Sequence, residues 1–215
     1  MKRVLDRLPS TDPRSANYPI RTLLAQTSST KPRSYTWTPG PVLDQGSEGA
    51  CVGFGTSGEL AARPVVVPNV DNAFAFEMYN EARQHDEWPG EDYEGTSVLG
   101  GMKAAQARGY YREYRWAENV DDLALAVGHS GPAVLGINWR DDMWDPDADG
   151  TLHVSGAVAG GHCIYTFGVS IRLKRFVIQN SWGPDWGKNG RAYISFDDMA
   201  KLLADDGEAA IPVGR

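Results

Sequence analysis

The chain has 215 residues, of which 41% are hydrophobic and 23% are charged, as is usual for a globular protein of one large domain or two small lobes. Its formal net charge of −7 argues against nucleic acid and anionic membranes as partners. The sequence has no apolar run of transmembrane length, no signal peptide and only two cysteines, too few for a disulfide framework. A cytoplasmic location is therefore the default expectation.

Residues 1–34 are rich in Pro, Ser, Thr and Arg and are predicted to form an N-terminal arm or short pro-segment, followed by one domain over 35–215. An edge strand is expected within 35–42. The periodicity and capping residues predict helices over 51–62, 72–83, 97–108, 119–127 and 197–205. Strands are predicted at 133–139, 162–169, 175–179 and 191–196. This order indicates an α+β protein with a helical lobe at about 43–128 and a β lobe at about 129–215.

A glycine-rich turn over residues 45–50 leads into Cys51, and the small apolar residues that follow predict a buried helix with Cys51 in its first turn. The positive end of a helix dipole lowers a thiol pKa, and the thiolate is the nucleophilic form of cysteine. Free backbone N–H groups in the turn and the side-chain amide of Gln45 are suited to binding an oxyanion. The alternative is a buried cysteine with a purely structural role.

A cysteine nucleophile needs a base, and His162 is the best placed of the four histidines because it follows two glycines and opens an apolar strand. Asn180 comes at the end of a later buried strand, where its side chain can accept the second N–H of His162 and fix the tautomer. Trp182 can then cover that hydrogen bond. The alternatives are a turn residue for Asn180 and core packing for Trp182 and Trp186.

These residues belong to a set of motifs that occur in a fixed order along residues 44–190. The motifs are Asp44-Gln45-Gly46, Gly49-Ala50-Cys51 with Phe54, Gly161-His162, and Gln179-Asn180-Ser181-Trp182-Gly183 with Trp186-Gly187 and Gly190. In this order they resemble the papain family of cysteine peptidases, and most of all its compact bacterial and viral forms. The resemblance implies a papain-like two-lobe α+β fold, in which an antiparallel β half-barrel faces a helical lobe across a substrate cleft.

The resemblance also implies a role for each residue of a Cys-His-Asn triad. Cys51 would be the nucleophile, His162 would form the thiolate–imidazolium pair and protonate the leaving amine, and Asn180 would orient His162. The expected activity is that of a thiol-dependent endopeptidase, which hydrolyses peptide or protein substrates through an acyl-enzyme without a cofactor. A catalytically silent peptide-binding or structural relative is an alternative, as is an amide-transferring or deamidating relative.

Three further residues acquire roles from the same resemblance. Gln45 and the backbone N–H of Cys51 would form the oxyanion hole. Gly95 would pair with the main chain of an extended substrate, with Trp182 also contributing to substrate binding. Val52 and Glu48 depart from the family pattern, which usually has Trp after the nucleophile and Cys three residues before it.

If the protein is made in a latent form, residues 1–34 must impose the latency, since this segment is much shorter than a long inhibitory pro-domain. We therefore expect the arm to act as an autoinhibitor by lying across the cleft. Cys163 directly follows the base on a strand and is interpreted as a core residue, because successive side chains on a strand point to opposite faces.

Two acidic segments lie outside these motifs. Asp145, Asp147 and Asp149 alternate before Gly150, like the first part of a calcium loop, and are a candidate structural calcium site. The alternative is a solvated acidic turn, and no other metal site is predicted. The second segment, residues 205–208, is interpreted as exposed charge.

Overall fold

The computed structural model describes residues 3–9, 12–26, 31–88 and 94–214. The helices are α1 (Arg21–Leu24), α2 (Cys51–Ala61), α3 (Asn72–His85), α4 (Val98–Ala107), α5 (Val120–His129) and α6 (Phe196–Ala204), with 3-10 turns at Pro13–Asn17 and Asp141–Met143. The strands are β1 (Tyr35–Thr36), β2 (Glu113–Trp116), β3 (Ala133–Arg140), β4 (Thr151–Leu152), β5 (Val158–Ser170), β6 (Arg175–Gln179), β7 (Arg191–Ser195) and β8 (Glu208–Val213).

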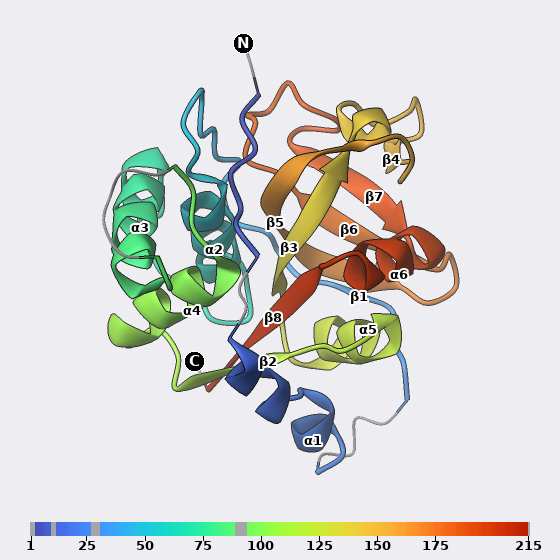
Figure 1. Ribbon diagram of the computed structural model, residues 1–215. Coiled ribbons are helices and arrows are strands. Elements are labelled where there is room, and N and C mark those ends of the chain that lie inside the picture. Colours follow the sequence, from blue (N-terminus) through green and yellow to red (C-terminus); the bar gives the residue numbers. More distant parts are fainter. Residues whose placement is uncertain (1–2, 10–11, 27–30, 89–93, 215) are drawn as a thin grey trace.

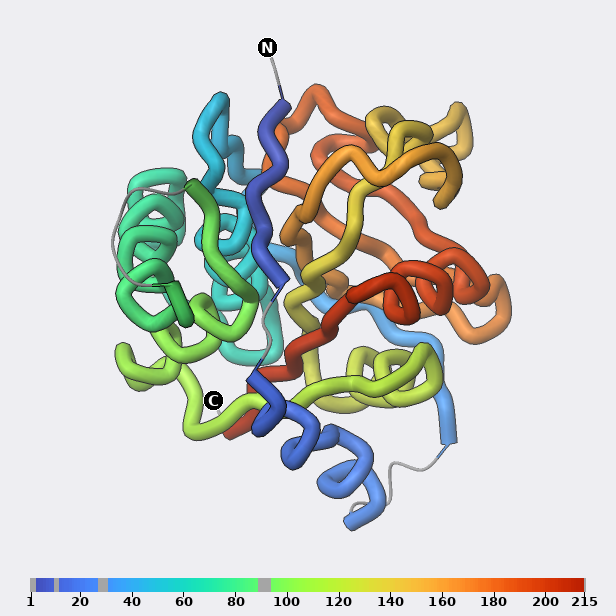
Figure 2. The backbone as a smooth tube through the Cα atoms, in the orientation of Figure 1, coloured from blue at the N-terminus to red at the C-terminus, as the bar shows by residue number. Residues whose placement is uncertain are grey.

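The molecule has a helical side and a sheet side, which confirms the predicted α+β class. Helices α2, α3 and α4 form the helical side, and the sheet carries α5 and α6 on the other (Figure 1). The N-terminal segment runs between the two sides, as the backbone trace shows (Figure 2). Within the described ranges, none of the helices has the length and apolar character needed to cross a membrane.

The sheet has the strand order β2-β8-β3-β5-β6-β7-β4, and β1 pairs separately with β5. All pairs are antiparallel except β4 with β7. Strand β5 is the longest, and it carries a run of eight buried residues because it pairs with β1, β3 and β6 while α2 packs against it. The strand is therefore a rigid support for His162.

Helix α2 is buried along its whole length, which its small residues make possible. A Cβ atom added at Gly53 would lie 2.4 Å from the carbonyl oxygen of Ala75 in α3. One added at Gly55 would lie 2.7 Å from Cys163 Sγ in β5. The glycines thus let α2 pack tightly between α3 and the sheet, and this packing fixes the position of Cys51 at its N-terminus.

The structure corrects the prediction for the acidic segment 205–208. Glu208 begins β8, a strand that the sequence did not predict, and its carboxylate pairs with Arg7 instead of facing solvent. The predicted edge strand is also shorter than expected, since only Tyr35 and Thr36 pair with β5. Strand β2 was missed as well, and it pairs with β8.

Candidate active site

The turn before α2 is joined to the loop after β6 by direct hydrogen bonds. The backbone N–H of Gln45 donates to the carbonyl of Ser181 at 2.9 Å, and the Ser181 hydroxyl donates to Gln45 Oε1 at 2.6 Å. Asp44 and Trp182 form a further antiparallel bridge. These contacts fix the turn that leads into Cys51 relative to the loop that carries Asn180, although the two are far apart in sequence.

Cys51 is the first residue of α2, as predicted, and its side chain is fully buried. Burial raises the pKa of its thiol to about 11, while backbone hydrogen bonds with Asp6 and Cys163 act in the opposite direction. Asp6 belongs to the N-terminal arm, so the arm is in contact with the candidate nucleophile. In this arrangement the sulfur is protonated at neutral pH.

His162 and Asn180 make the predicted contact. His162 Nε2 lies 2.8 Å from Asn180 Oδ1, and the same oxygen accepts the backbone N–H of Ser181 at 2.8 Å. Because a backbone N–H can only donate, the Asn180 atom is an acceptor and Nε2 must carry the imidazole proton. Nδ1 is then the basic nitrogen, and it is buried without a hydrogen-bond partner among the described residues. Burial lowers the pKa of His162 to about 4, while the bond to Asn180 raises it.

Aromatic rings enclose the imidazole. Trp182 stacks on His162 with 4.7 Å between ring centroids and 22° between planes, and Trp139 meets it edge-on at 5.0 Å. Trp139 was not singled out in the sequence. It lies in a predicted strand, but alternation along a strand does not show that one of its residues contacts a histidine on the neighbouring strand.

Residues 3–9 of the arm pass between the helical side and the sheet, in contact with both. The N–H of Arg7 donates to the carbonyl of Gly161 at 2.9 Å, and the N–H of Leu8 donates to the carbonyl of Thr96 at 2.9 Å. Gln45 Nε2 donates to the carbonyl of Glu48 at 2.8 Å and makes a longer bond of 3.4 Å to that of Val4. The candidate oxyanion donor therefore already points at a peptide carbonyl.

Two glycines make room for the arm. A Cβ atom at Gly95, whose φ is +87°, would lie 1.9 Å from the carbonyl oxygen of Asp6. One at Gly161 would lie 2.0 Å from the carbonyl oxygen of Arg7. Gly95 thus stands where a chain passes closely, and that chain is the arm; the role of Gly95 in substrate binding stays a prediction.

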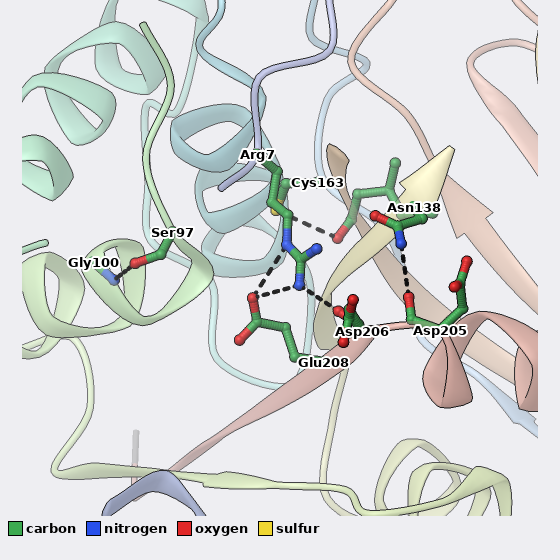
Figure 3. Close-up of polar contacts among 9 residues, drawn as sticks. Arg7, Ser97, Gly100, Asn138, Cys163, Asp205, Asp206 and Glu208 are labelled. Atoms are coloured by element: carbon green, nitrogen blue, oxygen red, sulfur yellow. Dashed lines mark hydrogen bonds and ion pairs between the residues drawn. The ribbon is translucent and has the colours of Figure 1, made fainter. Parts of the chain in front are cut away.

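The Arg7 side chain enters a polar pocket between α4, β3 and β8 (Figure 3). Its Nη2 donates to Glu208 Oε1 at 2.9 Å and to the carbonyl of Asp206 at 2.7 Å, and its Nε lies 3.2 Å from the same Glu208 oxygen. Burial raises the pKa of Glu208, and the Arg7 charge opposes this shift. Sequence reasoning missed this pair, which joins two residues 201 positions apart.

The other end of the arm is held near the surface. Arg3 Nη2 pairs with Asp145 Oδ1 at 2.8 Å, and Arg3 Nη1 donates to the carbonyl of Trp144. The guanidinium also lies 5.1 Å from the ring centre of Trp182, the tryptophan that stacks on His162. The arm therefore covers the site from the Trp182 side to the Glu208 side.

The alternating aspartates are engaged in contacts of other kinds. Asp147 Oδ1 accepts the N–H groups of Asp149 and Thr151, and its Oδ2 lies 2.8 Å from His153 Nε2. Asp145 is paired with Arg3. Among the residues that the structure describes, there is no group of three or more His, Cys, Asp or Glu side chains suited to a metal ion. The calcium hypothesis gains no support from this arrangement.

Cys163 is buried in the core, as predicted. Its Sγ lies against Gly55 of α2, and it packs in the same hydrophobic cluster as Val52 and Leu60. Burial raises the pKa of its thiol well above the usual value. Both cysteines are free.

Comparison with known proteins identifies the class that this fold and site define. The family model described as "Papain family cysteine protease" matches residues 68–203, more than half of the chain and the part that contains His162 and Asn180. The chain therefore belongs to the papain family of cysteine proteases, which confirms the resemblance seen in the sequence.

Individual relatives match at low identity. The oryzain gamma chain of Oryza sativa subsp. japonica is 27% identical over 186 residues, covering 70% of this chain and 50% of the relative. Cathepsin K of Gallus gallus is 28% identical over 219 residues, covering 85% of this chain and 65% of the relative. The chain thus spans between about a quarter and two thirds of the length of the first curated relatives it matches.

Solved structures confirm the papain-like fold. Xylellain, a cysteine protease from Xylella fastidiosa, superposes with a TM-score of 0.67 at 16% identity, covering 100% of this chain and 99% of that one. The bromelain protease of Ananas comosus, in complex with the E64 inhibitor, superposes with a TM-score of 0.52 at 16% identity. The match covers 86% of this chain and 100% of bromelain. At this identity the likeness establishes the fold alone.

Proposed function

We propose that this chain is a thiol-dependent endopeptidase that hydrolyses peptide bonds at Cys51 with a Cys51–His162–Asn180 triad. The observation that carries the proposal is the extended peptide in the cleft. The arm contacts Cys51, gives an N–H to the residue before His162 and receives a hydrogen bond from Gln45. A cleft that holds an extended chain in this way is suited to a peptide or protein substrate.

The first half of the reaction starts from a neutral Cys51 thiol and a His162 imidazole that is protonated on Nε2. With the arm displaced, Nδ1 of His162 takes the proton of Cys51, and the thiolate forms a C–S bond to the substrate carbonyl carbon. The electron pair of the C=O bond moves to oxygen, where Gln45 Nε2 and the Cys51 N–H stabilise the charge. The oxyanion then collapses, the C–N bond breaks, and the imidazolium protonates the leaving amine.

The second half regenerates the thiol. A water molecule gives a proton to His162 and attacks the thioester carbon, and the resulting oxyanion collapses with loss of the C–S bond. The imidazolium returns its proton to the sulfur, and the product leaves as a carboxylic acid. Asn180 keeps Nε2 protonated throughout, so that Nδ1 is the nitrogen that exchanges protons.

We propose further that residues 3–9 hold the enzyme in a latent state. While they cover the site, the thiol pKa of about 11 and the imidazole pKa of about 4 leave both groups neutral at pH 7. A neutral thiol is a poor nucleophile, and the arm also fills the space that a substrate needs. Departure of the arm admits water, which removes the burial that separates the two pKa values.

The test is the mass of the intact protein after exposure to an epoxysuccinyl inhibitor, whose epoxide carbon is attacked by a thiolate with opening of the ring. The Arg7→Ala variant, in which the arm is bound more weakly, should gain one adduct. Adding Cys51→Ala to this variant should abolish the adduct, whereas adding Cys163→Ala should not. Peptide turnover by Arg7→Ala should fall by about a thousandfold or more when Cys51→Ala is added. An unlabelled Arg7→Ala protein that turns over no peptide would instead identify a silent relative, and product masses would reveal amide transfer.

A further inference from the structure

The two cysteines of the chain lie next to each other where α2 packs on β5. Both are free and fully buried. The backbone N–H of Cys163 forms a hydrogen bond to the sulfur of Cys51, and a negative charge on Cys51 raises the pKa of Cys163. Both side chains belong to the same hydrophobic cluster. The nucleophile proposed above therefore has a second thiol as its neighbour.

The direction of the Cys163 side chain follows from the alternation along β5. His162 and Ile164 face the core of the sheet side, where the imidazole stacks on Trp182. Cys163 stands between them and faces the opposite way, toward α2. Its thiol thus points at the helix that begins with Cys51.

Gly55 leaves the space that this thiol occupies. Cys51 and Gly55 are four residues apart, so they lie on the same face of α2, one turn from each other. A Cβ atom at Gly55 would lie 2.7 Å from Cys163 Sγ. The sulfur therefore rests on the bare backbone of α2, and no side chain at position 55 separates it from Cys51. A disulfide requires this proximity of one cysteine to the backbone of the other.

The arm covers both thiols. Cys163 lies beside Arg7 (Figure 3), and Cys51 forms a hydrogen bond with the backbone of Asp6. While the arm is bound, burial keeps both sulfurs protonated and away from solvent. When the arm leaves, Cys51 is the sulfur that gains a base, His162, and it is therefore the first to react with an oxidant.

We propose that Cys51 and Cys163 form a reversible redox pair, in which Cys163 converts a sulfenic acid on Cys51 into a Cys51–Cys163 disulfide. The inference rests on the proposed function, because it needs Cys51 to be a nucleophile once the arm has left. It gives Cys163 a chemical role, whereas in a purely structural role its thiol only fills the space over Gly55.

The oxidant is hydrogen peroxide or an organic hydroperoxide. His162 takes the proton of Cys51, and the thiolate attacks a peroxide oxygen, so that an S–O bond forms and the O–O bond breaks. The leaving oxygen takes the proton from the imidazolium and departs as water or an alcohol. The sulfur of Cys163 then attacks the sulfenic sulfur, the S–O bond breaks, and hydroxide leaves as water with the Cys163 proton. Two thiols are thus oxidised by one peroxide, and an added dithiol reverses the change.

Proximity makes the disulfide the favoured product. Thiols that are held side by side react without having to diffuse together, whereas further oxidation of the sulfenic acid to a sulfinic acid needs a second peroxide molecule. Sulfinic and sulfonic acids are not reduced by thiols, but a disulfide is. The pair therefore turns an irreversible loss of the nucleophile into a reversible one.

The experiment exposes the full-length Arg7→Ala variant, in which the arm is bound more weakly, to hydrogen peroxide and measures its intact mass. The product should have lost two hydrogen atoms, and digestion without reductant should give one pair of peptides joined through Cys51 and Cys163. Adding Cys163→Ala should replace this product by one that has gained two or three oxygen atoms. Oxidation of Cys51 in Arg7→Ala without the joined peptides would overturn the proposal, and this result needs no change at Cys163.

Epoxysuccinyl labelling measures how much of the nucleophile survives. After peroxide and then dithiothreitol, Arg7→Ala should recover most of its labelling, and the variant that also carries Cys163→Ala should recover at least about fivefold less. Equal recovery would contradict the redox pair. Before peroxide the two variants should label at the same rate, which controls for damage to the site by the alanine.

The labelling also separates this inference from the proposed function. A protein that is labelled at Cys51 but forms no disulfide refutes only the redox pair. A protein in which Cys51 reacts with neither the epoxide nor peroxide refutes the proposed function and this inference with it.

Discussion

The two ends of the arm segment 3–9 are held by the same kind of ion pair in opposite surroundings. Arg3 and Asp145 are 29% and 71% exposed in their side chains, whereas Arg7 and Glu208 are 1% and 16% exposed. An exposed pair contributes about 0–1 kcal/mol, but removing one partner of a buried pair costs roughly 3–5 kcal/mol. The comparison indicates that the arm is anchored at residue 7, while residue 3 covers Trp182 without holding the segment in place.

The largest expected effect separates these two arginines. Arg7→Ala should raise the rate of epoxysuccinyl labelling at Cys51 by about two to three orders of magnitude, because losing roughly 3–5 kcal/mol of anchoring shifts the arm towards its displaced state. Arg3→Ala should change the rate by less than about fivefold. Time courses of intact mass at pH 7 measure both rates. Equal acceleration by the two variants would show that the arm has no dominant anchor.

The contrast between the buried and the exposed ion pair should also appear in the free energy of unfolding when the acidic partners are changed. Glu208→Gln leaves the Arg7 cation without its counter-charge and should lower the free energy of unfolding by about 3 kcal/mol. The matched variant Asp145→Asn removes a charge of the same sign at an exposed position and should change it by less than about 1 kcal/mol. Urea unfolding followed by circular dichroism compares the two. A larger loss for Asp145→Asn would reverse the assignment of the anchor.

The buried imidazole predicts how stability depends on pH. Burial lowers the pKa of His162 from 6.5 to about 4. Between pH 6.5 and 4, His162 is therefore protonated in the unfolded chain but not in the folded one. The contribution of His162 is therefore fully present above pH 6.5 and is lost as the pH falls towards 4, by about 3 kcal/mol. Unfolding free energies of the wild type and His162→Gln, measured from pH 7 to 4, isolate this contribution. A difference that stays constant over this range would contradict the burial of a neutral His162.

The smallest expected effect is that of salt. Ions screen the exposed pair of Arg3 and Asp145, but they have little access to Arg7 and Glu208. Raising NaCl from 0.05 to 1 M should therefore change the labelling rate of the wild-type chain by less than about threefold. A much larger acceleration would mean that exposed charges, and not the buried pair, keep the arm in the cleft.

The sequence allowed the prediction of those parts of the site that lie in local patterns. The small residues after Cys51 predict a buried helix, and the position of Asn180 at the end of a buried strand predicts its contact with His162. In each case the local composition agrees with the structure that forms.

The features that the sequence did not predict depend on contacts between residues that are far apart in the sequence. Arg7 lies in a polar arm and Glu208 in an acidic segment, and neither segment alone indicates burial, because each charge enters the interior only with the other as its partner. Strand β8 was overlooked because its first residue continues the acidic run. The position of Trp139 against His162 depends on the register between β3 and β5, which the sequence does not specify.

The central claim is that the arm and a ligand of Cys51 compete for one cleft. Amide hydrogen exchange tests it directly, because the N–H groups of Arg7 and Leu8 bond to the carbonyls of Gly161 and Thr96. Both amides should be protected in the free chain and should exchange rapidly once Cys51 carries the epoxysuccinyl adduct. Protection that persists in the fully labelled protein would show that the arm does not occupy the site, and would contradict this account of latency.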